Sequence, residues 1–161
     1  MATTETPAQI TREAVELWNR SYQGEVLGEA YFGHMAANAP DPGQRSKLEA
    51  LTALERCTKE LIAAAMGRLG LPAEPDPAVL EHVAQGADFD FHRMISMLPP
   101  VTADYLATYT RLRQLVGPEE ASTVDQVIAH EMALELFARR ELDGESEYSL
   151  EPIRALSHVT L

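Results

Sequence analysis

Residues 25–32 read EVLGEAYF and place two glutamates on the apolar side of a strongly helical segment, residues 11–37. At about 100° of rotation per residue, Glu25 and Glu29 project onto the middle of that side. An ionised carboxylate inside a helix bundle is costly unless something cationic meets it, and glutamate is rarely buried without a partner. The stretch therefore predicts a core helix with a metal or a polar active site on its inner face. The apolar residues on the same side are Leu17, Trp18, Tyr22, Val26, Phe32, Met35 and Ala36.

Two further helical segments repeat this pattern. In residues 118–143, Glu131 and Glu135 lie at the centre of the apolar stripe, and in residues 42–69, Glu55 lies inside the stripe but off its centre. A rise of about 1.5 Å per residue would bring these positions to a similar depth in antiparallel helices. We therefore predict that five glutamates converge in the interior. They are Glu25, Glu29, Glu55, Glu131 and Glu135.

The remaining segments complete an all-α chain with four main helices. The long connection after the second helix is expected to hold two short helices, residues 77–85 and 89–98. The prolines at 99–100 are expected to end the second of them, because proline lacks the N–H that continues a helix. The third main helix is expected over residues 101–116, and residues 149–156 are a candidate for a last short helix. No alternating apolar pattern of useful length indicates a strand.

Composition indicates one domain, residues 1–161, with 45% apolar residues to form its core. The formal charge of −12 disfavours a surface for nucleic acid or anionic membrane. Residues 1–10 lack the features of a signal peptide, and no apolar run approaches membrane-spanning length. Cys57 is the only cysteine, so one chain can build neither a disulfide framework nor a thiolate metal site. We expect a soluble, cytoplasmic protein whose partner is a small-molecule substrate.

The predicted carboxylate cluster needs a counter-charge. Two carboxylates one helical turn apart, about 6 Å, repel by roughly 3 kcal/mol at an effective dielectric near 20. Either a proton is retained, which places an acid beside a base, or a divalent cation neutralises the cluster. Oxygen-rich sites suit iron, manganese or magnesium, and four or more inward carboxylates would bridge two ions rather than one.

Three motifs carry a resemblance to a known family: EVLGEAYF at 25–32, LERCT at 54–58 and AHEMALELF at 129–137. Together with the long connection over 70–100, they resemble the ferritin-like superfamily, whose bundles bind two irons or manganeses through inward glutamates and Glu-x-x-His pairs. The resemblance implies a ferritin-like four-helix bundle with short extra helices in the crossover between the second and third main helices. It implies an oxidase or oxygenase that acts on a small organic substrate, with iron or manganese as cofactor. The implied metal ligands are Glu25, Glu29, Glu55, Glu131 and Glu135, of which Glu131 and Glu135 are the predicted catalytic pair.

The chain departs from that family pattern at several positions. Thr58, three residues after Glu55, and Leu134, three after Glu131, stand where ligating histidines would be expected. The third main helix offers no inward acid, but Tyr105 or Tyr109 could face the cluster instead. The resemblance therefore implies an altered site, which is either rich in carboxylates or has lost its metal and kept the acids for proton transfer.

The five histidines divide into two groups. His130, at the edge of the last apolar stripe, and His92, on a predicted short helix, are the two that we consider near the site. His34 faces solvent on the helical wheel, and His82 and His158 lie in or near short outer segments. We expect a surface position for these three.

Two alternatives to a metalloenzyme remain open. One is a metal-free enzyme in which a pair such as Glu131 and Glu135 shares a proton and serves in general acid–base chemistry. The other is a non-catalytic helical bundle, a possible homodimer, whose inward acids meet arginines of a partner chain. Within one chain, Arg56, Arg93 and Arg111 are candidate partners for the glutamates.

Overall fold

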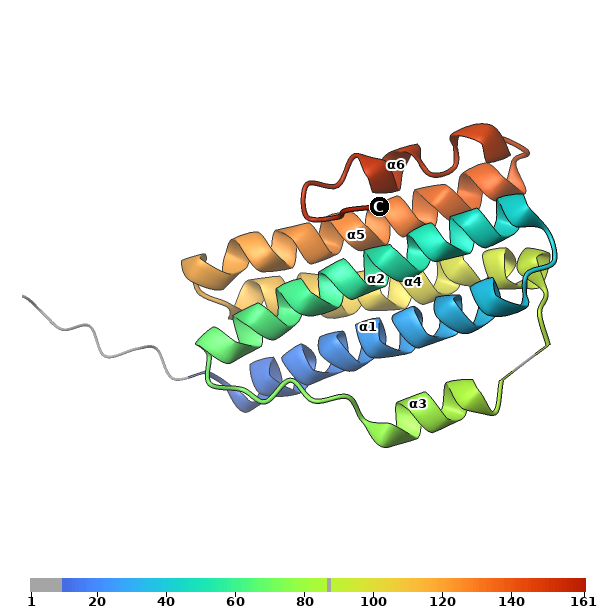
Figure 1. The fold of residues 1–161 in the computed structure, drawn as a ribbon. Coiled ribbons are helices and arrows are strands. Elements are labelled where there is room, and N and C mark those ends of the chain that lie inside the picture. The colour runs from blue at the N-terminus through green and yellow to red at the C-terminus, as the bar shows by residue number, and fades with distance from the viewer. Residues whose placement is uncertain (1–9, 87) are drawn as a thin grey trace, which may run out of the picture.

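Four long helices form the body of the protein in the computed structural model, which describes residues 10–86 and 88–161 (Figure 1). No strand occurs in those two ranges, so the all-α prediction is confirmed. The long helices are α1 (Arg12–Asn38), α2 (Pro42–Arg68), α4 (Phe91–Leu115) and α5 (Pro118–Leu142). The short ones are α3 (Pro77–Ala84), the 3-10 helix η1 (Ser146–Tyr148) and α6 (Glu151–Arg154).

The long helices are arranged as two hairpins, α1 with α2 and α4 with α5. The hairpins meet through packing of α1 on α4 and of α2 on α5, and α3 lies against α1 outside them (Figure 1). Within the described part of the chain, no helix is both long and apolar enough to cross a membrane. Residues 1–9, most of the stretch in which the sequence lacks signal-peptide features, lie outside the described residues.

The ends of the long helices follow from local chemistry. The side chains of Thr11 and Asp41 accept hydrogen bonds from the first turns of α1 and α2, which satisfies backbone donors that have no partner inside the helix. Gly70 and Gly144, just beyond α2 and α5, adopt φ values of 71° and 82°. This left-handed conformation ends a helix with little strain only when the residue lacks a Cβ.

One boundary prediction is wrong: Pro99 and Pro100 do not end a helix, because α4 runs through both of them. Each proline removes a backbone donor, which costs about 3 kcal/mol in a helix interior. The tertiary packing opposes this cost, because one buried face continues across the prolines from Leu98 to Thr102. Thr102 Oγ1 also donates a hydrogen bond to the Pro99 carbonyl at 3.0 Å. The expected separate helices 89–98 and 101–116 are therefore one element.

The core is divided into two apolar clusters that leave a polar layer between them. Along α1 the clusters separate between Val26 and Phe32, along α2 between Leu54 and Ile62, and along α5 between Val127 and Ala133. The buried polar residues Glu55, Thr58, His130 and Glu131 lie in these gaps, and buried Glu25 lies at the edge of the gap in α1. The polar layer is thus a cross-section of the helical assembly, at one depth in several helices.

Candidate metal centre and adjoining pocket

All four long helices contribute side chains to the polar layer. Glu25 comes from α1, Glu55 from α2, Tyr109 from α4, and His130 and Glu131 from α5; each is at most 5% exposed. The Tyr109 hydroxyl donates a hydrogen bond to Glu25 Oε1 at 3.0 Å. His130 lies between two carboxylates, with Nδ1 3.6 Å from Glu25 Oε2 and Nε2 3.4 Å from Glu55 Oε1.

Glu25, His130 and Glu131 form a group that could hold a metal ion. Each offers one ligand atom, and the three atoms lie within 4.8 Å of one another. Glu25 Oε2 and His130 Nε2 are buried and have no hydrogen-bond partner among the described residues. Leaving a buried acceptor unsatisfied costs about 1–3 kcal/mol, so a proton or a cation bound at either atom would remove this cost.

The carboxyl groups of the layer resist ionisation. Burial raises the pKa of Glu25 and of Glu131 well above the ordinary value; repulsion by Glu55 raises both further, and repulsion by Glu25 adds to the shift of Glu131. Burial also raises the pKa of Glu55 to about 8, although the neighbouring Glu25 carboxyl acts in the opposite direction. The pKa of His130 is lowered by burial, against the attraction of Glu25. Without a metal ion, burial therefore favours the protonated, uncharged form of these carboxyl groups.

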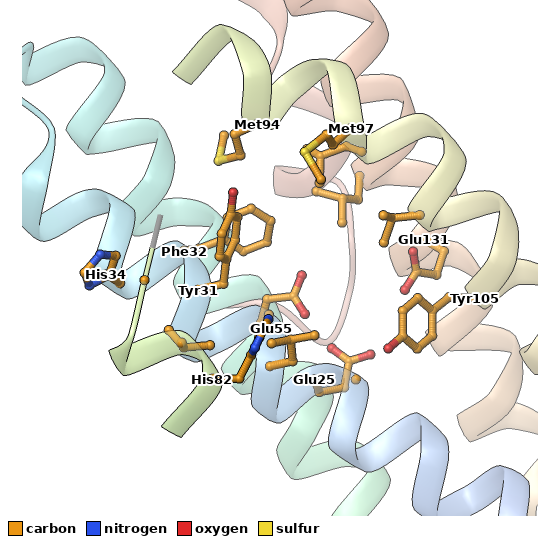
Figure 2. Close-up of a pocket in the computed structure, with 18 of the residues that line it drawn as sticks. Glu25, Tyr31, Phe32, His34, Glu55, His82, Met94, Met97, Tyr105 and Glu131 are labelled. Carbon is orange, nitrogen blue, oxygen red and sulfur yellow. The ribbon is translucent and has the colours of Figure 1, made fainter. Parts of the chain in front are cut away.

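A cavity of about 300 Å³ opens onto this layer between α1, α3 and α4. Figure 2 shows Glu25, Glu131 and Tyr105 gathered at one end and Tyr31, Phe32 and Met94 toward the other. The lining is mostly apolar and aromatic, with a few convergent polar groups, as is typical of small-molecule sites. The apolar and aromatic lining residues are Leu27, Tyr31, Phe32, Val83, Met94, Met97, Leu98, Val101, Tyr105, Tyr109 and Leu134.

Two glycines of α1 make room for this arrangement. A Cβ at Gly28 would overlap the Glu55 carboxylate, and one at Gly24 would overlap the Tyr105 ring. The two glycines are four residues apart and so lie on one face of α1. The carboxylate and the phenol therefore approach α1 more closely than any residue with a side chain would permit.

The structure brings Glu25, Glu55 and Glu131 together but not Glu29 or Glu135. Glu29 pairs with Arg56 and Lys59, and Glu135 pairs with Arg139. The prediction that all five glutamates converge is therefore wrong for Glu29 and Glu135. Four residues along a helix is about 40° beyond one full turn. That rotation carries both side chains to the edge, where they are 22% and 26% exposed and basic side chains reach them.

Glu29 illustrates the electrostatic consequence of that edge position. Burial acts to raise its pKa, but hydrogen bonds from Lys59 and Arg56 outweigh burial and lower the pKa below the ordinary value. The pairing with Arg56 is one of those that the sequence left open. Glu29 is therefore an ionised, paired carboxylate one turn away from Glu25.

The histidines differ most from expectation. His130 is completely buried rather than at an edge, while His92 is exposed and does not line the cavity. His82 is exposed, as expected, and with half-buried His34 it lines the outer wall of the cavity (Figure 2). His158, also expected at the surface, is half-buried and hydrogen-bonded to Thr58.

Thr58 and His158 are the residues of the layer that the sequence did not identify as functional. The sequence pointed to Thr58 only in that it is a polar residue on an apolar stripe, at the position where the ferritin-like pattern would have a ligating histidine. His158 gave no signal, because it lies in a tail without periodicity. Tyr105 and Tyr109 do line the cavity beside the cluster, as the sequence allowed.

Comparison with known proteins gives no match: no family model, no curated protein and no solved structure is significantly similar to this chain. What the structure supplies is a buried carboxylate–imidazole group in an all-helical protein, compatible with a helical bundle. The chemistry of the group must be inferred from its own residues.

Proposed function

We propose that this protein is a metal-dependent oxidase or oxygenase of the ferritin-like kind that acts on a small, largely apolar organic molecule. The observation that supports it most is the pair of buried, unpartnered atoms, Glu25 Oε2 and His130 Nε2, beside Glu131 at the polar end of the cavity. A protein that needed only stability would gain by replacing these groups with apolar ones of similar shape.

The donor set fits one ion of iron or manganese. Two carboxylates and one imidazole suit these metals better than a soft, thiolate-preferring one. Glu25, His130 and Glu131 would hold the ion, which would supply redox chemistry to a substrate in the cavity. Glu29 and Glu135 are occupied by basic partners, so the layer has fewer free carboxylates than the two-ion site suggested by the family resemblance.

The residues of the chain have separable tasks in this proposal. The Tyr109 hydroxyl orients the Glu25 carboxylate by holding Oε1, which leaves Oε2 for the ion. The apolar wall binds the body of the substrate and excludes water. Glu55, with a pKa raised to about 8 mainly by burial, can accept or release a proton near neutral pH.

The first test is metal content and metal-dependent stability. Protein purified without chelator is expected to contain iron or manganese, and added Mn(II) at about 100 times its dissociation constant should stabilise the fold by about 2.7 kcal/mol. Glu25→Gln and Glu131→Gln should lose this gain, whereas Glu49→Gln, an exposed residue of α2, should keep it. If the purified wild type contains no metal and its melting temperature does not change when Mn(II) is added, the metal centre is refuted.

The second test addresses the reaction. Small aromatic and aliphatic compounds that bind the cavity, detected by ligand-observed NMR, should stimulate oxygen uptake by the iron-loaded protein. A pocket-filling substitution such as Val101→Trp should abolish both binding and stimulated uptake while leaving iron binding intact, because Val101 lines the cavity but is not among the proposed ligands. Binding without any effect on oxygen uptake would argue against an oxidase or oxygenase.

A second candidate function, metal-free acid–base catalysis, is favoured by the raised pKa values of Glu25, Glu55 and Glu131, for which burial is the main cause. Their different surroundings could keep one carboxyl protonated beside another that is ionised. Turnover that persists in excess chelator and disappears in Glu55→Gln would favour this candidate over the metal centre.

A further inference from the structure

The chain after α5 turns back and runs along α5 (Figure 1), and Lys47 of α2 contacts it. Residues 143–161, here called the C-terminal segment, contain η1 and α6. Leu150 and Ile153 of this segment are buried in the same apolar cluster as core residues of α2 and α5. The C-terminal segment is thus an integral part of the packed structure.

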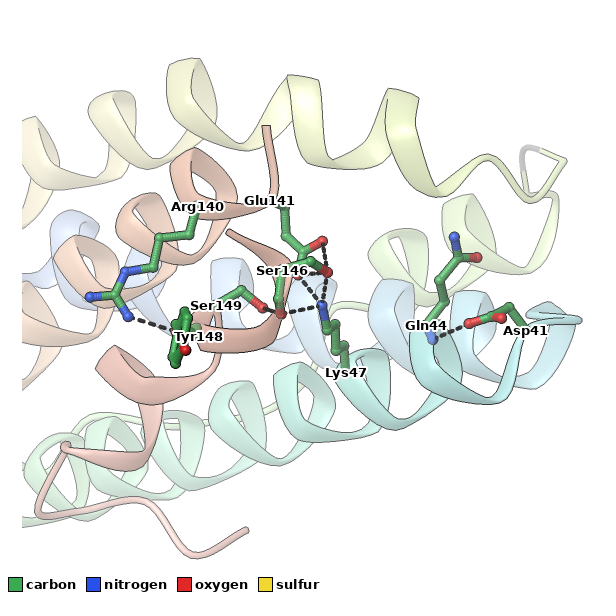
Figure 3. A network of polar contacts seen from close by, with 8 residues as sticks. All are labelled: Asp41, Gln44, Lys47, Arg140, Glu141, Ser146, Tyr148 and Ser149. Atoms are coloured by element: carbon green, nitrogen blue, oxygen red, sulfur yellow. Dashed lines mark hydrogen bonds and ion pairs between the residues drawn. The ribbon is translucent and has the colours of Figure 1, made fainter. Parts of the chain in front are cut away.

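Polar contacts fix the path of the C-terminal segment (Figure 3). Lys47 of α2 donates a hydrogen bond to the Ser146 carbonyl at 2.8 Å and also contacts the side chains of Ser146 and Glu141. Arg140 of α5 donates to the Tyr148 carbonyl at 2.6 Å and pairs with Glu151 at 2.9 Å. These contacts attach the segment to both helices before it reaches His158.

His158 connects the segment to the polar layer. Its Nε2 lies 2.9 Å from Thr58 Oγ1, and the same oxygen lies 2.8 Å from His130 Nδ1. Thr58 and His130 are both completely buried. A hydroxyl has a single hydrogen, so Thr58 can donate to only one of the two rings and must accept from the other.

The surroundings of His130 select one direction for this chain of hydrogen bonds. A hydrogen on Nδ1 has Thr58 Oγ1 as its acceptor at 2.8 Å, whereas Nε2, although 3.4 Å from Glu55 Oε1, forms no hydrogen bond with any of the described residues. The Nδ1–H tautomer therefore leaves no buried donor of His130 unsatisfied. In that tautomer Thr58 donates to His158, and the lone pair of His130 Nε2 is free.

We propose that the C-terminal segment is a functional part of the metal centre, in which His158, acting through Thr58, is a positioning residue for His130. His158 accepts the Thr58 hydrogen, Thr58 accepts from His130 Nδ1, and His130 is held with its Nε2 lone pair available to an ion. A ligating histidine whose other N–H is held in this way is oriented and made a stronger ligand. The role of His130 as a ligand rests on the proposed function, whereas its tautomer does not.

The tautomer is tested in metal-free protein with ¹⁵N-labelled histidine. Two-bond ¹H–¹⁵N spectra are expected to place the His130 hydrogen on Nδ1 in wild type and in Thr58→Ser, which keeps a hydroxyl. In Thr58→Val and His158→Phe the preference should weaken or reverse. His92→Phe, a change at an exposed histidine, is the matched control and should leave the His130 signals unchanged.

Metal affinity is tested with Mn(II) by calorimetric titration of the full chain. Loss of such an outer partner typically weakens metal binding about 10–100-fold, and we expect that range for His158→Phe and Thr58→Val, with little change for Thr58→Ser and His92→Phe. Unchanged affinity and an unchanged tautomer in His158→Phe would overturn the proposal while leaving the metal centre intact. Wild type that binds no Mn(II) would refute the metal centre, and the tautomer spectra would still decide the role of His158. Should His158→Phe fail to fold, an Nε2–H tautomer in wild type would overturn the proposal.

Discussion

Glu25 and Glu29 are one helical turn apart, yet the pKa values of their carboxyl groups are shifted in opposite directions. Burial, with no lysine or arginine in contact, raises the pKa of Glu25, while two basic side chains lower that of Glu29. On α5, Glu131 is buried in the polar layer, whereas Glu135 lies at the edge and pairs with Arg139. A candidate ligand is therefore distinguished from a structural ion pair by the neighbouring cations, which a single helix does not reveal.

Glu131→Gln is expected to stabilise the metal-free protein near pH 8 by about 1–3 kcal/mol, because it removes the cost of a buried charge. The folded-state pKa of Glu131 is raised, mainly by burial, so the destabilisation is present above that pKa and disappears as pH falls toward the unfolded value. Chemical denaturation at pH 8 and pH 5 measures both effects. Glu135→Gln, which removes an exposed ion pair, should change stability by less than about 1 kcal/mol at either pH. Equal effects of the two substitutions on stability would contradict the distinction between a buried Glu131 and a paired Glu135 at the edge.

Glu55 leads to a prediction about pH. Its folded-state pKa of about 8 lies above the ordinary value of 4.5, so the folded protein binds more protons between those values. The stability of the metal-free protein should therefore be highest near pH 4.5 as far as Glu55 is concerned, and should fall as pH rises to about 8. Melting temperatures across this range, compared between wild type and Glu55→Gln, measure the effect. If the melting temperature changes with pH equally in Glu55→Gln and in wild type, Glu55 does not cause the pH dependence.

At the scale of single elements, sequence periodicity predicted α1, α2 and α5 because each is amphipathic over its whole length. It did not predict that α4 would continue through Pro99 and Pro100, since the packing that opposes the local cost comes from other helices. It could not place His158 either. The C-terminal segment is positioned by Lys47 and Arg140, each of which donates a hydrogen bond to a backbone carbonyl of the segment, a contact that has no sequence signature. Glu25, Glu55 and Glu131 do meet, because the sequence correctly predicted both their depth along each helix and the helix face on which they lie.

Glycine substitutions within α1 test how closely that helix approaches the site. Gly28→Ala should destabilise the protein by about 1–3 kcal/mol, because its Cβ would collide with the Glu55 carboxylate and displace it. Gly33→Ala is the control on the same helix, since its Cβ would meet Thr52 at an ordinary 3.7 Å. That change should stabilise by up to about 1 kcal/mol through helix propensity. Denaturant titration measures the free energy of unfolding of both variants. A Gly28→Ala variant that is more stable than wild type would show that the Glu55 side chain can move away at no cost in free energy.

At the scale of the whole molecule, the polar layer lies where the two hairpins meet. Glu25 and Glu55 belong to the α1–α2 hairpin, and His130 and Glu131 belong to the α4–α5 hairpin. Neither hairpin alone contains the group that could hold a metal ion. The cavity is likewise shared, because α1 and α4 form opposite walls.

This division has a consequence for the rate of folding. Each hairpin is made of contacts close in sequence, which form fast, whereas docking of the hairpins requires distant contacts and is expected to be slow. Docking also dehydrates Glu25, Glu55 and Glu131 together, which is easier when they carry protons. Stopped-flow refolding of the metal-free protein should therefore be faster at pH 5 than at pH 8, and Glu131→Gln should reduce the difference. Refolding at the same rate at both pH values would mean that the carboxyl groups are buried only after the rate-limiting step.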